Sequence, residues 1–178
     1  PKRGEKAKLL TMALRNAENE LEGLLTARNA EMELLSRLQK KLKLARLPER
    51  IECFDNSNIG AAQAVASMVV FEKGKPCKSA YRKFKIKAVD IQDDYAYMHE
   101  VLSRRLGKLK SQPESEVRPD LLMVDGGRGQ LGIALAVIRE LALADQLDTI
   151  AIAKKDEKKG QTQDKIFKPH RANPIAFG

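Results

Sequence analysis

A chain of 178 residues can bury the core of one domain with an appendage. Its net charge of +9 favours a polyanionic partner, with nucleic acid as the first candidate and an anionic membrane surface as the second. Its two cysteines, Cys53 and Cys77, have no CxxC spacing, which argues against a disulfide framework and against a zinc site. No apolar run reaches the roughly 18 residues of a membrane span, so we expect a cytoplasmic protein, and Pro1 in place of Met suggests a fragment of a longer one.

The first 47 residues are expected to form a helical extension, followed by a domain over residues 48–178. From residue 5 to about residue 45 there is no proline and one glycine, Gly23, while leucine and alanine recur every three or four residues. This pattern predicts one long helix, or two that meet near Gly23. We interpret the Lys and Arg on its other face as a solvated surface. Pro48 ends the pattern because proline cannot donate a backbone hydrogen bond.

Three strands are predicted after Pro48. Residues 50–54 are mostly β-prone, and residues 64–71 are rich in β-branched side chains and end at a turn. Residues 81–86 alternate with the period of a strand. Because the connections between the three segments are short, they indicate an antiparallel meander.

The rest of the chain is predicted to form, in order, a helix, a strand, a second helix and a second strand. Residues 93–109 and 130–143 have apolar faces of helical period, and the short apolar runs 121–124 and 149–153 are typical of buried parallel strands. Right-handed crossovers connect such units. We therefore expect an α/β fold of the ribonuclease H-like class, with a mixed five-stranded sheet of three meander strands and two parallel strands, flanking helices and the N-terminal helical extension.

Acidic residues occur where a site for divalent metal ions could form. Asp55 and Asp125 each follow an apolar strand directly, at the C-terminal strand ends where sites in open α/β sheets lie. Asp93 and Asp94 begin the intervening helix and could add a third carboxylate. Divalent cations about 4 Å apart, held by such oxygens, can cleave phosphodiesters. A turn at Asp55 and helix caps at the other positions remain alternatives.

The loop at residues 125–130, DGGRGQ, also resembles a phosphate-binding loop, because glycines between a strand and a helix expose backbone amides. However, it has neither the GxxxxGK[ST] nor the GxGxxG pattern, and its leading Asp would repel an anion unless a cation intervened. We therefore expect this loop to lie beside a metal ion and a scissile phosphate, and not to bind a nucleotide.

Basic side chains are candidates for a DNA groove. They come from the third predicted strand, the first helix of the domain and the glycine-rich loop: Arg82, Lys83, Lys85, Lys87, Arg104, Arg105 and Arg128. The alternative is a solvated face, since basic residues on edge strands also suppress aggregation. His99 and His170 have no sequence partner that would make either of them a catalytic base.

Five stretches together resemble the successive motifs of the endonuclease domain of the UvrC family. They occur in the order and spacing of that family: RIECFDNSN at 50–58, VASMVVF at 65–71, DDYAYM at 93–98, VLSRR at 101–105 and VDGGRGQL at 124–131. The resemblance extends from about residue 5 to the last residue and includes Ala153-Lys154-Lys155 and Asn173-Pro174.

The resemblance implies a ribonuclease H-like nuclease that makes the incision on the 5′ side of a lesion in double-stranded DNA during nucleotide excision repair. It implies Mg²⁺ or Mn²⁺ as cofactor, with Asp55, Asp94 and Asp125 as the metal-binding and catalytic carboxylates. It also implies UvrB as a partner, bound through a segment outside this chain.

Two departures from the family pattern bear on activity. The family usually has His where this chain has Asn58, and Asn cannot titrate near neutral pH. The family's catalytic histidine belongs to a helix beyond the Asn-Pro segment, and His170 is not part of that motif. We therefore expect a fragment with the acidic site and impaired cleavage. The alternative is a noncatalytic DNA- or protein-binding module on the same scaffold, which would have no reason to gather carboxylates against DNA phosphates.

Overall fold

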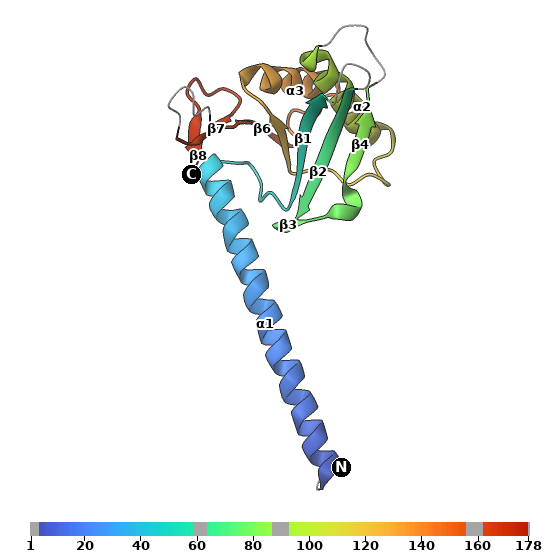
Figure 1. The fold of residues 1–178 in the computed structure, drawn as a ribbon, viewed down its shortest axis with the longest axis vertical. Helices are drawn as coiled ribbons and strands as arrows, with labels where there is room; N and C mark the ends of the chain where they lie inside the picture. The colour runs from blue at the N-terminus through green and yellow to red at the C-terminus, as the bar shows by residue number, and fades with distance from the viewer. Residues whose placement is uncertain (1–3, 59–63, 87–92, 156–161, 178) are drawn as a thin grey trace.

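The computed structural model describes residues 4–58, 64–86, 93–155 and 162–177 (Figure 1). It shows an α/β domain from which a single helix of 38 residues, α1 (Glu5–Leu42), extends with the N-terminus at its far end (Figure 1). The helix continues through Gly23, so the sequence pattern forms one helix and not two.

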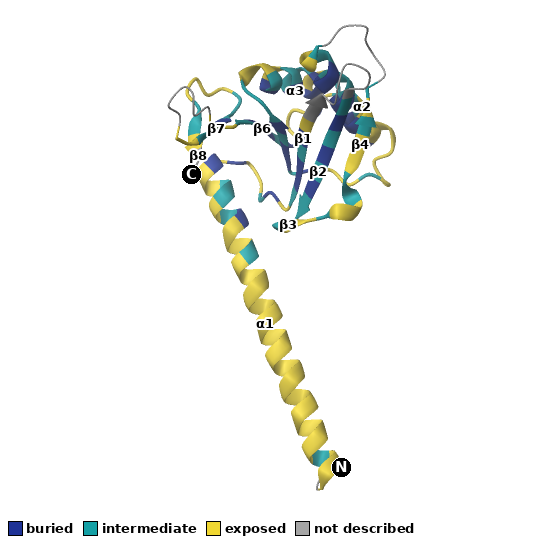
Figure 2. Ribbon diagram, viewed as in Figure 1, coloured by how far each residue is buried: buried dark blue, intermediate teal, exposed yellow. Residues whose placement is uncertain are grey.

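Most of α1 is exposed to solvent, and only its last turns contact the domain (Figure 2). Leu35 and Leu42 are buried, whereas leucines nearer the N-terminus, such as Leu21, are more than half exposed. The helix ends at Lys43, which has a left-handed backbone conformation. Lys168 donates hydrogen bonds to the carbonyl oxygens of Leu42 and Lys43, and this anchors the end of α1 to the domain.

The described residues form one mixed sheet of eight strands, in the order β3-β2-β1-β5-β6-β7-β8 with β4 also paired to β2. The strands are β1 (Arg50–Asn58), β2 (Ala64–Glu72), β3 (Lys75–Pro76), β4 (Arg82–Lys85), β5 (Leu121–Asp125), β6 (Asp148–Ala153), β7 (Asp164–Phe167) and β8 (Ile175–Phe177). Antiparallel pairing of β1 with β2 and of β2 with β4 confirms the predicted meander. Parallel pairing of β1 with β5 and of β5 with β6 confirms the two predicted parallel strands.

The sequence analysis did not predict β3, β7 and β8. Strand β3 has two residues, and β7 and β8 extend the sheet from β6 as antiparallel strands of four and three residues. Segments this short hold too few residues for alternation to be recognised. A short 3₁₀ helix, η1 (Lys78–Ala80), precedes β4.

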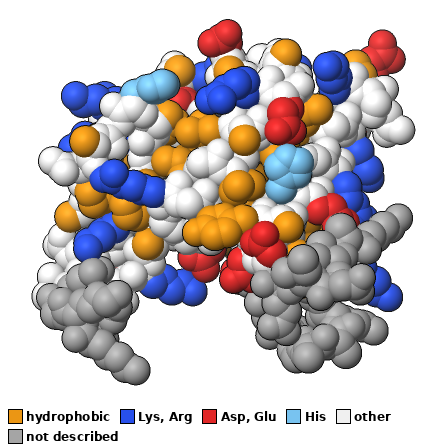
Figure 3. Space-filling model, turned by 90° about the horizontal axis from the view of Figure 1, so that it is seen from above, with side chains coloured by type: hydrophobic (Ala, Val, Ile, Leu, Met, Phe, Trp, Pro, Cys, Tyr) orange, Lys and Arg blue, Asp and Glu red, His pale blue; other side chains and the backbone are white. Residues whose placement is uncertain are grey.

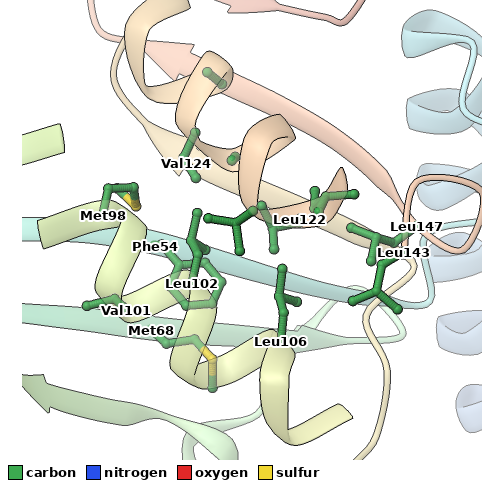
Figure 4. Close-up of a cluster of buried hydrophobic side chains, with 14 of the residues drawn as sticks. Phe54, Met68, Met98, Val101, Leu102, Leu106, Leu122, Val124, Leu143 and Leu147 are labelled. Atoms are coloured by element: carbon green, nitrogen blue, oxygen red, sulfur yellow. The ribbon is translucent and has the colours of Figure 1, made fainter. Parts of the chain in front are cut away.

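Helices α2 (Asp94–Ser111) and α3 (Arg128–Glu140) pack on one face of the sheet and enclose the main core. Figure 4 shows Phe54 and Met68 from the strands against Met98, Leu102 and Leu106 from α2. All five side chains are almost completely buried. Burial of this kind supplies most of the free energy that holds the two helices on the sheet.

The opposite face of the sheet carries a second, smaller apolar cluster. Strand residues that alternate with the main core, such as Ile51, Leu121 and Ile150, pack there with Leu42 and Leu44 from the end of α1 and with Ile166 of β7. Cys53 and Met123 lie on the same face. Asp55 and Asp125 lie two residues after Cys53 and Met123. By the same alternation they project from this face, at the carboxyl ends of β1 and β5.

A buried ion pair connects β1 to α2. Glu52 is fully buried, and its carboxylate accepts hydrogen bonds of 2.9 and 2.7 Å from the guanidinium of Arg105. Arg105 also donates to Glu116 and to the carbonyl of Val117. Arg105 is only 5% exposed and its donors bind inside the domain, which favours a structural role over contact with DNA, although the residue also lines the cavity between β4 and α2.

Candidate active site

Three carboxylates meet at one end of the sheet. Asp55 in β1, Asp125 at the end of β5 and Asp94 at the start of α2 line a cavity of about 170 Å³ together with Gly126 and Gln130. Figure 3 views the domain from above, onto this end of the sheet, and shows acidic side chains gathered among apolar and basic ones. The structure thus brings together the three acidic residues that the sequence singled out; their binding of a metal ion stays a prediction.

The register of the sheet explains why Asp55 and Asp125 are neighbours. Phe54 and Val124 are partners in the parallel pairing of β1 and β5, so the aspartates that follow them emerge side by side. The N-cap of α3 is Gly127, with no side-chain cap hydrogen bond, which removes the helix-cap alternative for Asp125.

The two acidic residues at the start of α2 have different positions. The carboxylate of Asp93 accepts a hydrogen bond of 2.9 Å from the backbone N–H of Tyr95 and caps the helix. Asp94 is the first helical residue, and it lines the acidic cavity. One residue of the pair therefore caps the helix, and the other lines the cavity.

The glycines of the loop after β5 provide room for neighbouring side chains. Gly126 has a φ of +132°, and a Cβ there would lie 2.7 Å from Cδ of Gln130. A Cβ on Gly129 would lie 2.5 Å from the hydroxyl oxygen of Tyr95. The N–H of Gly126 donates to the carbonyl of Ile152 at 2.8 Å, so this amide is occupied within the sheet. These glycines allow close packing around the acidic cavity.

Lys154 is a site residue that we did not single out. It follows β6 directly, and its Nζ lies 3.7 Å from Oδ2 of Asp125, with 82% of its side chain exposed. Such an exposed ion pair contributes little to stability. The signal in the sequence is the one that found Asp55 and Asp125, namely a charged residue directly after an apolar strand.

The donor set of the acidic cavity suits a hard divalent cation. Among the described residues, no three His, Cys, Asp or Glu side chains are close enough together to hold a metal ion by themselves. Mg²⁺, however, needs only one or two carboxylates and takes its other ligands from water and substrate phosphates. The chemistry of the three carboxylates therefore fits an open site that is completed by water and phosphate.

An apolar cavity of about 310 Å³ adjoins the acidic one and shares Asp55 and Asp125 with it. Cys53, Val69, Met123 and Ile152 are among its lining residues. Burial, and the nearby charge of Glu52, raise the pKa of Cys53 to about 11. The thiol is therefore protonated at neutral pH and is not an activated nucleophile.

The remaining basic residues lie around the domain at its surface. Arg82, Lys83 and Arg104 line a third cavity, of about 210 Å³, between β4 and α2. Arg104 stacks on the ring of Phe84 at 5.6 Å and donates to the carbonyl of Lys85 at 2.8 Å. Their contact with DNA stays a prediction.

Three basic candidates remain. Lys85 is exposed on β4, and its contact with DNA also stays a prediction. Arg128, at the start of α3, lies 5.9 Å from the centre of the Phe167 ring. Lys87 falls outside the described residues.

Neither histidine belongs to the acidic cavity. His99 on α2 pairs with Glu140 on α3 at 3.3 Å. His170 lines a cavity of about 480 Å³ beside the first residues of β6, Asp148 and Thr149, at the opposite end of that strand from the carboxylates. The structure therefore gives no role in the acidic cavity to either histidine.

Residues 39–178 match the family model of the UvrC RNAse H endonuclease domain. The chain is 49% identical over 178 residues to the UvrABC system protein C of Desulfatibacillum aliphaticivorans, and 50% identical over 175 residues to that of Desulforapulum autotrophicum. These matches cover 100% and 98% of this chain but 29% and 28% of the two relatives. The chain thus spans less than a third of the length of these relatives.

The solved structures that match are more distant. A crystal structure of Ciona intestinalis endonuclease V in complex with DNA is 17% identical, with a TM-score of 0.43 over 86% of this chain and 82% of that one. The Thermus thermophilus RuvC structure is also 17% identical, with a TM-score of 0.32 over 63% and 68% of the two chains.

Proposed function

The chain belongs to the family of UvrC ribonuclease H endonuclease domains, and from this premise we propose that it hydrolyses a phosphodiester bond on the 5′ side of a lesion in double-stranded DNA, in nucleotide excision repair. The observation that carries the proposal is the convergence of Asp55, Asp94 and Asp125 on one small cavity. A surface meant only to bind DNA would gain nothing from three carboxylates, because they repel phosphates.

Each carboxylate is held by a different element. Asp55 and Asp125 belong to paired central strands, and Asp94 is fixed by the start of α2, whose other residues pack on the core. Magnesium or manganese bound there would supply charge neutralisation for phosphodiester hydrolysis. The contribution of the fold is to position these acceptors before the substrate arrives.

The proposed partners are damaged double-stranded DNA and, through a segment outside these 178 residues, UvrB. A net charge of +9 and the exposed Arg82, Lys83 and Arg104 support attraction to DNA. Among the described helices, none is long and apolar enough to cross a membrane. We propose a cytoplasmic location, where the DNA substrate is found.

The family's catalytic histidine lies in a helix beyond the Asn-Pro segment, and we therefore propose that these 178 residues cleave DNA slowly by themselves. The test is nicking of plasmid DNA in Mn²⁺. We expect slow nicking that disappears in Asp125→Asn and persists in Asp145→Asn, an exposed control outside the cavity. Nicking as fast as that of a chain extended through the histidine helix would contradict impaired cleavage, and unchanged nicking in Asp125→Asn would contradict the site.

A noncatalytic binding module is the second candidate, and the exposed length of α1 favours it. Exposed apolar residues along α1, such as Leu14 and Leu21, could bind another protein. In that case Asp125→Asn would leave DNA binding unchanged, or strengthen it by removing a negative charge. Weaker DNA binding without any effect on metal binding would count against both functions.

A further inference from the structure

The acidic cavity has many hydrogen-bond acceptors and few donors. Of the five described residues that line it, Asp55, Asp94 and Asp125 carry carboxylates that only accept when ionised. The N–H of Gly126 already donates to Ile152. Gln130 has a carboxamide with two N–H donors. It is therefore the lining side chain that can donate a hydrogen bond to a ligand.

The side chain of Gln130 is held close to the loop that follows Asp125. Gln130 lies in the first turn of α3, and its Cδ, Cγ and Oε1 are 2.7 to 2.8 Å from the position that a Cβ on Gly126 would take. Gly126 also has a positive φ, which side chains other than glycine rarely adopt. Both the backbone conformation and the free space at residue 126 thus let Gln130 fold back toward the carboxylates.

A DNA phosphate entering this cavity would bring its own negative charge among the three carboxylates. Its non-bridging oxygens need donors or cations to be stable there. Lys154 lies 3.7 Å from a carboxylate oxygen of Asp125 and lines the adjoining apolar cavity. We propose that Gln130 is a substrate-binding residue of this site and donates a hydrogen bond from its amide to a non-bridging oxygen of the bound phosphodiester. This inference rests on the proposed nuclease function.

Two substitutions of similar size at Gln130 test separately the loss of the hydrogen-bond donor and the location of the side chain beside the carboxylates. Gln130→Met removes the hydrogen bond without adding charge, and we expect affinity for a short DNA duplex in Ca²⁺ to fall about tenfold while Mn²⁺ binding is retained. Gln130→Glu adds a fourth carboxylate, so we expect Mn²⁺ to bind at least as tightly and DNA to bind more weakly. Gln112→Glu makes the same change at the exposed C-terminal end of α2 and should leave both affinities unchanged.

Fluorescence anisotropy measures the DNA affinity, calorimetry measures Mn²⁺ binding, and thermal unfolding checks that each variant is folded. Wild-type DNA affinity in Gln130→Met would overturn the inference. So would Mn²⁺ and DNA affinities in Gln130→Glu that match those of Gln112→Glu, and this result decides the matter if the methionine variant does not fold. Failure of the unsubstituted chain to bind Mn²⁺ would instead count against the proposed function.

Discussion

Arg104 and Arg105 are adjacent in the sequence, but the fold uses them in opposite ways. Arg105 shares the buried stripe of α2 with Met98, Leu102 and Leu109, at helical spacings of three and four residues. Arg104 points to the surface. This spacing was present in the sequence and could have excluded Arg105 from the DNA candidates.

The buried position of Arg105 leads to a stability prediction. Arg105→Met removes two hydrogen bonds to the fully buried carboxylate of Glu52 and leaves Arg50 as its cationic partner, so we expect the free energy of unfolding to fall by about 3 kcal/mol. Urea unfolding measures this change. Arg104→Met, at the exposed neighbouring position, should change it by less than about 0.5 kcal/mol. Equal losses in the two variants would contradict the structural role of the ion pair.

Two glycines of the same segment should respond to alanine in opposite directions. Gly126→Ala places a side chain at φ +132° against Gln130, and we expect a loss of about 1 to 3 kcal/mol. Gly132 lies within α3 with nothing within 4 Å of an added Cβ, so Gly132→Ala should stabilise the domain by about 0.5 to 1 kcal/mol. The midpoint of thermal unfolding should fall in the first variant and rise in the second. A rise in both would show that residue 126 tolerates a side chain.

Among the secondary-structure elements, the long ones with strong periodicity could be predicted and the short ones could not. Strand β2 has nine residues, most of them apolar and several β-branched, and α1 has an uninterrupted helical pattern. Strand β7 pairs with the edge that β6 offers, and β8 pairs in turn with β7, so both strands depend on tertiary pairing. Similarly, the positions of Asp55 and Asp125 follow from strand ends, whereas the place of Gln130 depends on the backbone at Gly126, which the sequence does not show.

Helix α1 contributes to domain stability only through its last turns. Leu42 is 1% exposed in the second apolar cluster, and Leu21 is 58% exposed. We expect Leu42→Ala to lower the free energy of unfolding by about 2 to 5 kcal/mol. Leu21→Ala should change it by no more than about 0.5 kcal/mol. The same urea experiment measures both.

Removal of residues 1–29 provides a second check on α1. It leaves Glu31, which pairs with Lys75 of β3 at 2.6 Å, and all the buried leucines of the helix. The melting temperature of the domain should therefore be retained. A large drop would show that the exposed part of the helix supports the domain.

At the scale of the whole molecule, one end of a basic domain concentrates negative charge. The chain has a net charge of +9, yet Asp55, Asp94 and Asp125 line the same small cavity at the carboxyl ends of the central strands. This local concentration of carboxylates supports the proposed site for a divalent metal ion.

Calorimetric titration of Mn²⁺ into the chain, beside Asp55→Asn and Asp125→Asn, tests this account most directly. We predict that the unsubstituted chain binds Mn²⁺, that either substitution abolishes binding, and that the exposed control Asp145→Asn binds as the unsubstituted chain does. Binding that persists undiminished in both cavity variants would contradict a metal site shared by the two strand-end carboxylates.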